Sequence, residues 1–294
     1  MRYRFIRGHR SLFSVKKMCR VLEVSPSGYY RWLRVPVSMR KRENARLKEE
    51  IRRIYAFHRG RAGSPMITAD LHDKREYAKV SRCRVARLMK QMGLRCRSIK
   101  KHPFTTDSRQ TGPVAPNHLD RNFEVSSPNR VWVSDITYMR IGESWHYLSI
   151  FLDLYSRKIV GWDISHSLEK GSVLRALRQS LKRRRPAEGL MIHSDRGIQY
   201  ASHAFREILR DHGFIQSMSR KGNCWDNAVA ESFFHTIKAQ LIHPYRFRTI
   251  KEARRALFEY IEVYYNRKRK HSTNGYLSPV DYERQWEEHY EKAA

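Results

Sequence analysis

Three acidic residues in the second half of the chain have the types and spacing needed to hold a metal ion. Asp135 lies within an alternating apolar segment, Asp195 ends a short apolar run, and Glu231 lies in DNAVAESFF, where an amphipathic helix begins. Carboxylate oxygens are the ligands that Mg²⁺ and Mn²⁺ prefer, and a pair of such ions supports in-line displacement at phosphorus. The three acids therefore indicate metal-dependent phosphoryl transfer, provided that the fold brings them together.

Each acid has a simpler interpretation when it is taken alone. An aspartate at a strand end is often a turn residue, and a helical glutamate is usually a solvated member of an ion pair. The spacing favours a shared site, because 59 residues separate Asp135 from Asp195 and 35 separate Asp195 from Glu231. Asp153 and Asp163 lack a comparable sequence context, and we interpret both as structural.

Strands and helices predicted from the apolar pattern of residues 131–270 must position these acids. The predicted strands are 131–139, 146–154, 158–164, 190–195 and 214–219. The predicted helices are 172–183, 202–212, 227–240 and 251–266. Three strands followed by alternating helices and strands are typical of an α/β domain with a mixed five-stranded sheet flanked by helices.

Residues 1–100 are predicted to be helical and to contain two helix-turn-helix-like segments. The first ends in a helix with Pro26 at its first position, preceded by a serine N-cap. The second follows a helix at 45–57, and its own first helix is predicted at 66–77. Ser81 is the predicted N-cap of its second helix.

The outward face of that last helix is predicted to be basic. Its residues are Arg82, Arg84, Arg87 and Lys90. A basic face on the second helix of such a pair is suited to contacts with DNA phosphates or to docking in the major groove. A merely solvated helix face is the alternative.

The charge of the chain favours a nucleic-acid partner. Its 294 residues include 59 Lys and Arg against 29 Asp and Glu, a net charge of +30. Residues 1–130 carry +22 of this excess and residues 131–294 carry +8. A surplus of this size is typical of proteins that bind polyanions. The polar stretch 101–130 reads as a linker between the helical region and the α/β domain, and 271–294 as a C-terminal tail.

The cysteines and the apolar runs bear on the compartment. A zinc site built from His58, His72, Cys83 and Cys96 is an alternative, but the close ligand spacing of structural zinc sites is missing. Free thiols in a reducing compartment are the favoured interpretation. Neither a signal peptide nor an apolar run long enough to span a membrane is evident, so we expect a cytoplasmic protein that faces DNA or RNA and has no membrane partner.

The segments around the three acids resemble a known family. WVSDITY, HSDRGIQYAS and DNAVAESFFHTIK occur in this order, and together they resemble the catalytic protein of insertion-sequence-three-family transposases. The core of that family is similar to retroviral integrase and has a ribonuclease-H-like fold. SVKKMCRVLEVSPSGYYRWL near the N-terminus and YNRKRKHSTNGYLSPVDYE near the C-terminus extend the resemblance over nearly the whole chain.

The resemblance implies roles for individual residues. Asp135, Asp195 and Glu231 would be the catalytic triad that binds Mg²⁺, with Mn²⁺ as a substitute. Lys238, two helical turns after Glu231, would meet the DNA end, although a plain surface lysine is the alternative. Asn227 would orient Glu231 or contact DNA, unless it only caps the helix.

Two positions near the acids, His193 and Gln240, have no single role assigned by the sequence. His193, on the same strand face as Asp195, either helps to position the site or is a satisfied buried histidine. Gln240 stands where many relatives carry an acid, which weakens any role for that position and leaves the triad intact.

The expected function is DNA transposition. The resemblance implies cleavage of DNA at insertion-sequence ends, followed by attack of the freed 3′-hydroxyl on another phosphodiester. The partners would be the double-stranded terminal repeats and target DNA, further copies of the chain on that DNA, and an upstream-frame protein as fusion or partner. Two alternatives are a ribonuclease-H-like nuclease that does not join strands, which the helix-turn-helix segments disfavour, and a DNA-binding regulator with an inert core, which the intact triad disfavours.

Overall fold

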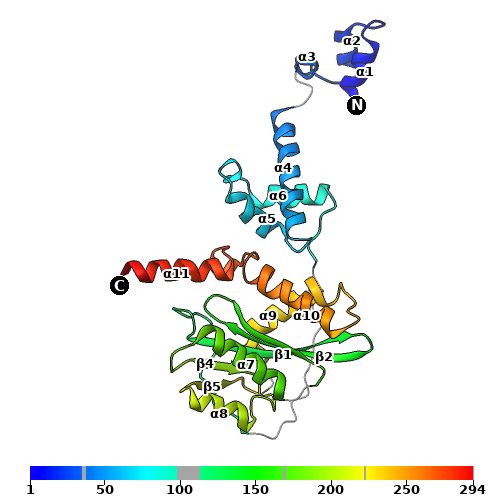
Figure 1. Cartoon of the computed structure of the whole chain (residues 1–294). Coiled ribbons are helices and arrows are strands. Elements are labelled where there is room, and N and C mark those ends of the chain that lie inside the picture. Colours follow the sequence, from blue (N-terminus) through cyan, green and yellow to red (C-terminus); the bar gives the residue numbers. More distant parts are fainter. Residues whose placement is uncertain (35–37, 98–112, 168–169, 222, 294) are drawn as a thin grey trace. The chain divides into compact units, whose positions relative to one another are not determined.

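The protein consists of two compact units, which we describe separately. The computed structural model describes residues 1–34, 38–97, 113–167, 170–221 and 223–293. Its contacts divide the chain into Met1–Cys96, which is helical, and Arg97–Ala294, which contains the sheet (Figure 1). Within the described part of the chain, no helix is both long and apolar enough to cross a membrane.

The first three helices form a small cluster. They are α1 (Arg2–His9), α2 (Val15–Val21) and α3 (Pro26–Arg34). The buried core of this cluster comprises only Ile6, Met18, Cys19 and Tyr29. As predicted, Pro26 begins α3 after a serine N-cap, and the Oγ of Ser25 accepts a hydrogen bond from the NH of Gly28 at 3.2 Å.

A second cluster follows in the same unit. Its elements are α4 (Met39–Phe57), α5 (Ser64–His72), the 3₁₀ turn η1 (Arg75–Tyr77) and α6 (Arg82–Gln91). The facing sides of α4, α5 and α6 share one apolar core, which includes Ile51, Ile67 and Leu88. The Ser81 side chain caps α6 as predicted, accepting from the NH of Arg84 at 3.3 Å.

Two predicted boundaries in this cluster were wrong. The helix predicted at 45–57 begins earlier, at Met39, because the Ser38 side chain caps it and accepts from the NH of Lys41 at 3.4 Å. The helix predicted at 66–77 ends at His72, and a 3₁₀ turn replaces its last residues. Charged side chains obscure the periodicity at both ends, so the apolar pattern alone could not locate them.

The second unit contains a mixed five-stranded sheet, which confirms the predicted α/β class. Its strands are β1 (Val131–Ile141), β2 (Ser144–Asp153), β3 (Ile159–Ser165), β4 (Met191–Ser194) and β5 (Ile215–Met218). They lie in the order β3-β2-β1-β4-β5, with β1, β2 and β3 antiparallel and with β4 and β5 parallel to β1. The sheet therefore places β1, the strand of Asp135, at its centre.

Helices cover both faces of the sheet (Figure 1). Side chains alternate along β1, so Trp132 faces the core beneath α7 (Lys170–Arg184) and α8 (His203–Asp211), and Val133 faces the opposite core. That second core is covered by α9 (Ala228–Ile237) and α10 (Ile250–Phe258). Because both faces are buried, the strands read as almost continuous apolar runs.

Close packing of α7 on β3 depends on a glycine. A Cβ added at Gly161 would lie 2.0 Å from the Oγ of Ser180 and 2.5 Å from the carbonyl oxygen of Ala176. Real side-chain atoms do not approach so closely, so only glycine lets α7 rest on the strand at this point.

The last predicted helices contain wide turns. The predicted helix 227–240 corresponds to α9, which follows the 3₁₀ turn η2 (Cys224–Asn227) and continues into the π-helical turn η3 (Lys238–Ile242). Likewise, α10 continues into the π-helical turn η4 (Glu259–Tyr265). Such turns insert one residue into the helical register, which an apolar periodicity of 3.6 does not reveal.

The predicted C-terminal tail, 271–294, is folded as far as it is described, which is to residue 293. It contains the 3₁₀ turn η5 (Ser272–Asn274) and the helix α11 (Pro279–Ala293). Glu283 of α11 is only 3% exposed and accepts hydrogen bonds from Ser156 and Lys158. A buried, bonded carboxylate fixes the start of α11 to the sheet domain.

The predicted linker 101–130 also needs correction where it is described. Residues 98–112 lie outside the described residues. Leu119 is buried in the core of the sheet domain, and the NH groups of His118 and Leu119 donate to the Oγ of Ser217 at 3.0 and 3.2 Å. The later part of this stretch is therefore packed onto the domain, although it forms neither helix nor strand.

Candidate active site

Asp135 lies in the middle of β1, and its side chain is half-buried. The NH of Ile136 donates to its Oδ1 at 2.7 Å. Burial raises the pKa of Asp135 well above its ordinary value, the Asp195 carboxylate raises it further, and Glu231 adds a smaller effect in the same direction. The three acids named by the sequence thus act on one another at Asp135.

Asp195 directly follows β4 and lies beside Asp135 because of the strand pairing. In the parallel register of β1 and β4, Val133 pairs with His193, so the residues two positions later are neighbours. The NH of Gly197 donates to Asp195 Oδ1 at 2.9 Å. Part of the Asp195 side chain reaches solvent, yet the surrounding protein excludes enough water to raise its pKa above the ordinary value.

Glu231 lies in the first turn of α9, the helix that packs on β1. Its carboxylate is exposed toward solvent, and partial burial raises its pKa above the ordinary value. The packing of α9 on β1 explains why a glutamate so distant in the sequence affects Asp135. The three acids therefore come from a central strand, the end of its parallel neighbour and a covering helix.

The acids are close enough to repel one another, but they are not arranged as a closed ion cage. Within the described ranges, no three His, Cys, Asp or Glu side chains are grouped tightly enough to hold a metal ion. Asp135 and Asp195 each direct an Oδ1 to a main-chain NH instead. To share an ion, these carboxylates would have to turn toward one another.

Lys238 lies near the acids at the end of α9. Its Nζ lies 4.8 Å from the centre of the Tyr138 ring on β1, a cation–π contact. Burial lowers the pKa of Lys238, and attraction from Asp135 opposes this effect. The structure thus places a half-buried positive charge near Asp135.

A chain of polar contacts lies beneath the acids and includes a residue that the sequence analysis missed. Asn227 occupies the N-cap position of α9 without capping it, and its Nδ2 donates to the carbonyl oxygen of Ser134 at 3.2 Å. The hydroxyls of Ser134 and the buried Tyr200 lie 2.8 Å apart. Burial raises the pKa of Tyr200 well above its ordinary value, and Asp195 and Asp135 add to this effect. The motif HSDRGIQYAS, which contains Tyr200, was the available signal.

His193 is a satisfied buried histidine. It is fully buried, and its ring nitrogens lie 2.9 Å from the Oγ of Ser217 and 3.1 Å from the Oγ of Ser219. Burial lowers the pKa of His193 to about 4, so the ring is neutral near neutral pH. The structure therefore supports the interpretation of His193 as a satisfied buried histidine. Its two contacts join β4 to β5 and to the residue that follows β5.

Asp226, the residue before Asn227, anchors the loop that leads into α9. Its buried carboxylate accepts hydrogen bonds from Arg220, Arg121 and Asn117. Hydrogen bonds from Arg220 hold the pKa of Asp226 well below its ordinary value. These contacts tie the stretch before β1 to the entrance of α9, and so they fix the position from which Glu231 projects.

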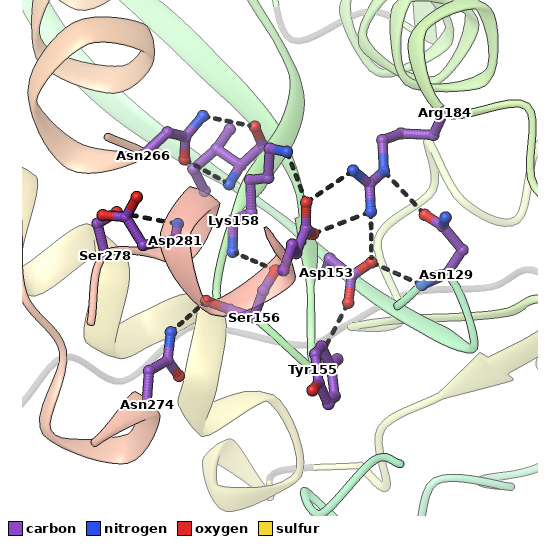
Figure 2. Close-up of polar contacts among 12 residues, drawn as sticks. Asn129, Asp153, Tyr155, Ser156, Lys158, Arg184, Asn266, Asn274, Ser278 and Asp281 are labelled. Carbon is purple, nitrogen blue, oxygen red and sulfur yellow. Dashed lines mark hydrogen bonds and ion pairs between the residues drawn. The ribbon is translucent and has the colours of Figure 1, made fainter. Parts of the chain in front are cut away.

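The remaining acids near the strands have structural roles, as predicted. Asp153 is fully buried, accepts from the NH groups of Asn129 and Tyr155, and lies near Arg184 (Figure 2). Burial raises the pKa of Asp153 to about 6. Asp163 pairs with two arginines of the covering helices. Gln240 is buried and accepts from the Tyr260 hydroxyl at 2.8 Å, so that position points into the core.

The predicted basic face of α6 is only partly outward. Arg82, Arg87 and Lys90 are exposed. Arg84 is turned back onto α4, where its guanidinium donates to Asn44 Oδ1 at 2.8 Å and to the Glu43 carboxylate at 3.1 Å. The prediction that Arg84 faces outward was wrong, because acceptors on α4 lie within its reach.

The alternative zinc site does not form. His58 is bound to Asp70 at 2.6 Å, and His72 lies 2.8 Å from the carbonyl oxygen of Val80. Cys83 is exposed, and the Sγ of Cys96 donates to the carbonyl of Arg61. Three of the four side chains are thus bonded to other groups, and no cluster able to hold a metal ion is found among the described residues.

Family models match most of the chain. Two descriptions of an integrase core domain match residues 125–224 and 231–286, and an HTH-like domain matches residues 41–102. The integrase matches include the sheet, α9 from Glu231 onward and all three acids. The sheet order and these matches define the second unit as an integrase-type, ribonuclease-H-like catalytic core. In the sequence, a helix-turn-helix-like region precedes it.

Similar proteins identify the family more closely. The chain is 42% identical to an uncharacterised 31 kDa protein of insertion element IS600 from Shigella sonnei, over 90% of this chain and 96% of that protein. It is 37% identical to the transposase InsF for insertion sequence IS3A from Escherichia coli K12, over 96% and 98% of the two chains. The chain belongs to the IS3 family of insertion-sequence transposases.

Solved integrase structures are also similar to the chain. The catalytic core domain of HTLV-2 integrase in complex with magnesium matches with a TM-score of 0.43 and 16% identity, covering 53% of this chain and 97% of that one. The simian T-cell lymphotropic virus intasome in complex with a PP2A regulatory subunit matches with a TM-score of 0.46 and 14% identity, covering 79% and 73%.

Proposed function

We propose that this transposase cleaves DNA at insertion-sequence ends and transfers the freed 3′ ends to another DNA, using Mg²⁺ held by Asp135, Asp195 and Glu231. The observation that carries the proposal is the convergence of the three carboxylates on Asp135 from β1, from the end of β4 and from α9. Asp195 and Glu231 raise the free-energy cost of keeping Asp135 ionised, and the positive charge of Lys238 lowers it. Such a site attracts a cation.

The donor set fits a hard divalent cation. All three side chains offer carboxylate oxygens, which suit Mg²⁺, and Mn²⁺ would substitute. Mutual repulsion and partial burial disfavour the ionised carboxylates, so a bound cation would relieve both. When bound, the ion supplies charge stabilisation at phosphorus and lowers the pKa of the attacking hydroxyl or water.

The residues of this chain would then position the reacting DNA. In the first step, a water oxygen bonds to phosphorus and the bond to the 3′ oxygen breaks, which leaves a 3′-hydroxyl. In the second, that hydroxyl oxygen bonds to another phosphorus, whose bond to its 5′ oxygen breaks. Each step exchanges one P–O bond for another and needs no covalent link to the protein. Lys238 is placed to hold a phosphate beside the acids.

Asn227 would affect the same site indirectly, by holding two of the acids in position. Its contact with the Ser134 carbonyl sets the distance between β1 and the start of α9. Since Asp135 follows Ser134 and Glu231 lies one turn after Asn227, the contact positions two of the three acids. We therefore assign Asn227 to positioning the acids and assign the DNA contact to Lys238.

Basic side chains of the helical unit would hold double-stranded DNA, both element ends and target. Arg82, Arg87 and Lys90 remain for this role, and Arg84 is excluded by its contacts with α4. Each phosphate contact releases counterions, so affinity should fall with salt by a slope of roughly one per contact. Replacing each of the three by alanine should lower that slope by about one, whereas Arg53→Ala, an exposed arginine of α4, should leave it unchanged.

The direct test is strand cleavage and joining on labelled element-end DNA with Mg²⁺ or Mn²⁺. Glu231→Gln keeps the size of the side chain and removes its charge, so it should bind DNA but neither cut nor join it. Glu188→Gln is a matched control, because Glu188 is exposed and lies before β4, at the strand end opposite to Asp195. Equal activity of Glu231→Gln and wild type would remove Glu231 from the site.

Other outcomes would separate the alternative functions. Cleavage without joining would point to a ribonuclease-H-like nuclease, and binding without either reaction would point to an inert regulator. The second test adds the product of the upstream reading frame, as a fusion or a separate protein. Activity that appears only then would show that this chain catalyses transposition together with that partner, as an assembly of several copies on DNA.

A further inference from the structure

Four aromatic rings form a continuous row along α11 and the adjoining turn after β2, which we call the aromatic row: Tyr155, Tyr282, Trp286 and Tyr290. The ring centres of Tyr155 and Tyr282 lie 4.9 Å apart in a stacked arrangement, and those of Trp286 and Tyr290 lie 5.2 Å apart. Tyr155, from the turn after β2, also meets Trp286 edge-on at 6.5 Å. The row thus extends from the sheet domain along most of the helix.

The row borders a shallow hollow of about 420 Å³. Trp286, Glu288 and His289 line one part of it, and Tyr290 is 63% exposed. Single exposed aromatic residues are common, but adjoining rings beside a hollow are typical of binding surfaces. Tyr and Trp also supply a large share of the affinity at protein interfaces.

The start of α11 is held rigidly, so the row is presented in a fixed position. Arg184 and Lys158 reach the buried Glu283 at 2.9 and 2.6 Å. Figure 2 shows Arg184 and Lys158 at this place, together with Ser278 and Asp281 at the start of α11. Asp281 and Ser278 cap the helix through a hydrogen bond at 3.2 Å from the NH of Asp281 to the Ser278 hydroxyl. A surface fixed in this way loses little conformational freedom when it binds.

The charge of α11 is opposite to that of the rest of the chain. Between Pro279 and Ala293 there are five acidic residues and two basic ones, in a protein with a net charge of +30. The carboxylates of Glu287, Glu288 and Glu291 are exposed beside the row. DNA phosphates would be repelled here, whereas a basic protein surface with apolar side chains would be attracted.

The chain itself contains a surface of that description. The N-terminal cluster, Arg2–Arg34, has nine basic residues and one acidic residue. Its core is small, and it leaves large apolar side chains in solvent: Phe5 (49% exposed), Leu12 (72%), Phe13 (56%), Val21 (73%) and Tyr30 (52%). An apolar and basic cluster of this kind complements an aromatic and acidic helix.

We propose that the aromatic row of one copy binds the N-terminal cluster of a second copy. Each copy carries both surfaces, so two copies paired around a twofold axis would bury each surface once and leave neither unpaired. The interface does not depend on the reaction that the catalytic core performs. Its test therefore uses no DNA, and its failure would leave the proposed cleavage and joining reactions untouched.

The first experiment measures self-association of the full chain by light scattering over a range of concentrations. Trp286→Ala with Tyr290→Ala should weaken association at least about tenfold, as expected for central aromatic anchors. Trp145→Ala removes a tryptophan on β2 that is 53% exposed and lies outside the aromatic row, and it should have no effect. The proposal would be overturned if the wild-type chain were monomeric over the whole concentration range. It would also be overturned if Trp145→Ala weakened association as much as the double variant does.

Charge reversal tests which surfaces meet. Glu287→Lys with Glu288→Lys should weaken association, as should Arg7→Glu with Arg10→Glu on the N-terminal cluster. Combining all four changes in one chain should restore association, because each acid–base pair is then reversed on both sides. Failure of the combined variant to recover, while each variant melts like wild type, would show that the two surfaces do not meet.

Cross-linking distinguishes a contact between two copies of the chain from a contact within one copy. A photoreactive phenylalanine analogue at position 290 is used in a mixture of isotopically light and heavy chains. Cross-links between light and heavy peptides that map to residues 2–34 would support the proposal. Cross-links confined to a single chain, or to other segments, would contradict it.

Discussion

The side-chain amide of Asn227 donates to the main-chain carbonyl of Ser134 at 3.2 Å, and so it joins the start of α9 to the centre of β1. Ser134 immediately precedes Asp135, and Glu231 follows Asn227 by one helical turn. The other atom of the amide, Oδ1, is buried, and no hydrogen-bond partner of it is found among the described residues. One hydrogen bond thus links the two elements that bring Asp135 and Glu231 together.

We expect Asn227→Ala to slow strand cleavage more than it destabilises the fold. Loss of the hydrogen bond should lower the free energy of unfolding by about 1 kcal/mol. The acids would then be held less firmly, so the rate should fall by tenfold or more, because small misplacements of catalytic groups are costly. Asn223→Ala, in the loop before η2, is the control. Equal rates for both variants, measured as single-turnover cleavage, would remove Asn227 from the positioning of the acids.

Asp135→Asn should make the metal-free protein more stable at pH 7. Burial and the neighbouring carboxylates raise the pKa of Asp135, so its ionisation opposes folding. Replacement by neutral Asn removes this cost and should raise the free energy of unfolding. The cost of ionisation appears only as the pH rises above the ordinary pKa, so the gain should vanish near pH 4.

Urea unfolding in EDTA measures this gain, with and without added Mg²⁺. Wild type should be stabilised by Mg²⁺ and Asp135→Asn should not, because a ligand stabilises only the form that binds it. Asp163→Asn, which breaks the pairs with Arg175 and Arg254, is the contrasting control and should be destabilising. A destabilised Asp135→Asn protein would mean that the acids do not repel one another.

His193 should make the stability fall in mildly acidic solution. Burial lowers the pKa of the folded-state imidazole from 6.5 to about 4, so between these values the unfolded chain binds the proton. This contribution to stability is complete above pH 6.5 and is lost as the pH falls toward 4. Between pH 6.5 and 5 the loss amounts to about 2 kcal/mol. In His193→Asn, the free energy of unfolding from urea curves should fall by about 2 kcal/mol less between pH 6.5 and pH 5. An unchanged dependence of stability on pH would mean that the buried ring is already charged.

The sequence was sufficient to predict the sheet and the acids for physical reasons. Strands buried on both faces are strongly apolar, so all five were found within a few residues. Asp135 interrupts one of these apolar runs and Asp195 directly follows another, and the flanking motifs gave the order of the three acids. Convergence of Asp135 and Asp195 follows from the parallel pairing of β1 with β4, which the pattern alone did not specify.

Features that depend on packing between distant segments were not predictable. Arg84 was placed on an outward face because helical periodicity cannot show that Asn44 and Glu43 of α4 lie within its reach. Glu283 resembled an ordinary solvated glutamate, since its partners lie more than a hundred residues earlier in the chain. Tyr200 was likewise one aromatic residue among many until its hydroxyl was found next to Ser134.

Glu283→Gln should strongly destabilise the sheet domain. The buried carboxylate pairs with Arg184 at 2.9 Å and with Lys158 at 2.6 Å, and these cations hold its pKa below the ordinary value against the effect of burial. Removing one member of a buried ion pair leaves the other charges uncompensated, which typically costs about 3–5 kcal/mol. Glu124→Gln changes an exposed glutamate of the same domain and should cost less than about 0.5 kcal/mol. Similar unfolding curves for the two variants would show that α11 is not fixed by this contact.

Gly161→Ala should be the most disruptive single methyl addition in the sheet. The new Cβ would lie 2.0 Å from the Ser180 Oγ and 2.5 Å from the Ala176 carbonyl oxygen, so α7 would have to move away from β3. Overpacking of this kind costs roughly 1–3 kcal/mol or more. Gly8→Ala on α1 is the matched control, because nothing lies within 4 Å of its added Cβ, and alanine there should be neutral or slightly stabilising.

A second change separates the two contacts at Gly161. Ser180→Ala removes the closer obstacle and leaves the Ala176 carbonyl in place, so the double variant Gly161→Ala with Ser180→Ala should recover only part of the lost stability. Thermal unfolding of the single and double variants gives the coupling between the two positions. Full recovery would mean that the serine hydroxyl alone sets the spacing, and no recovery would mean that the backbone of α7 sets it.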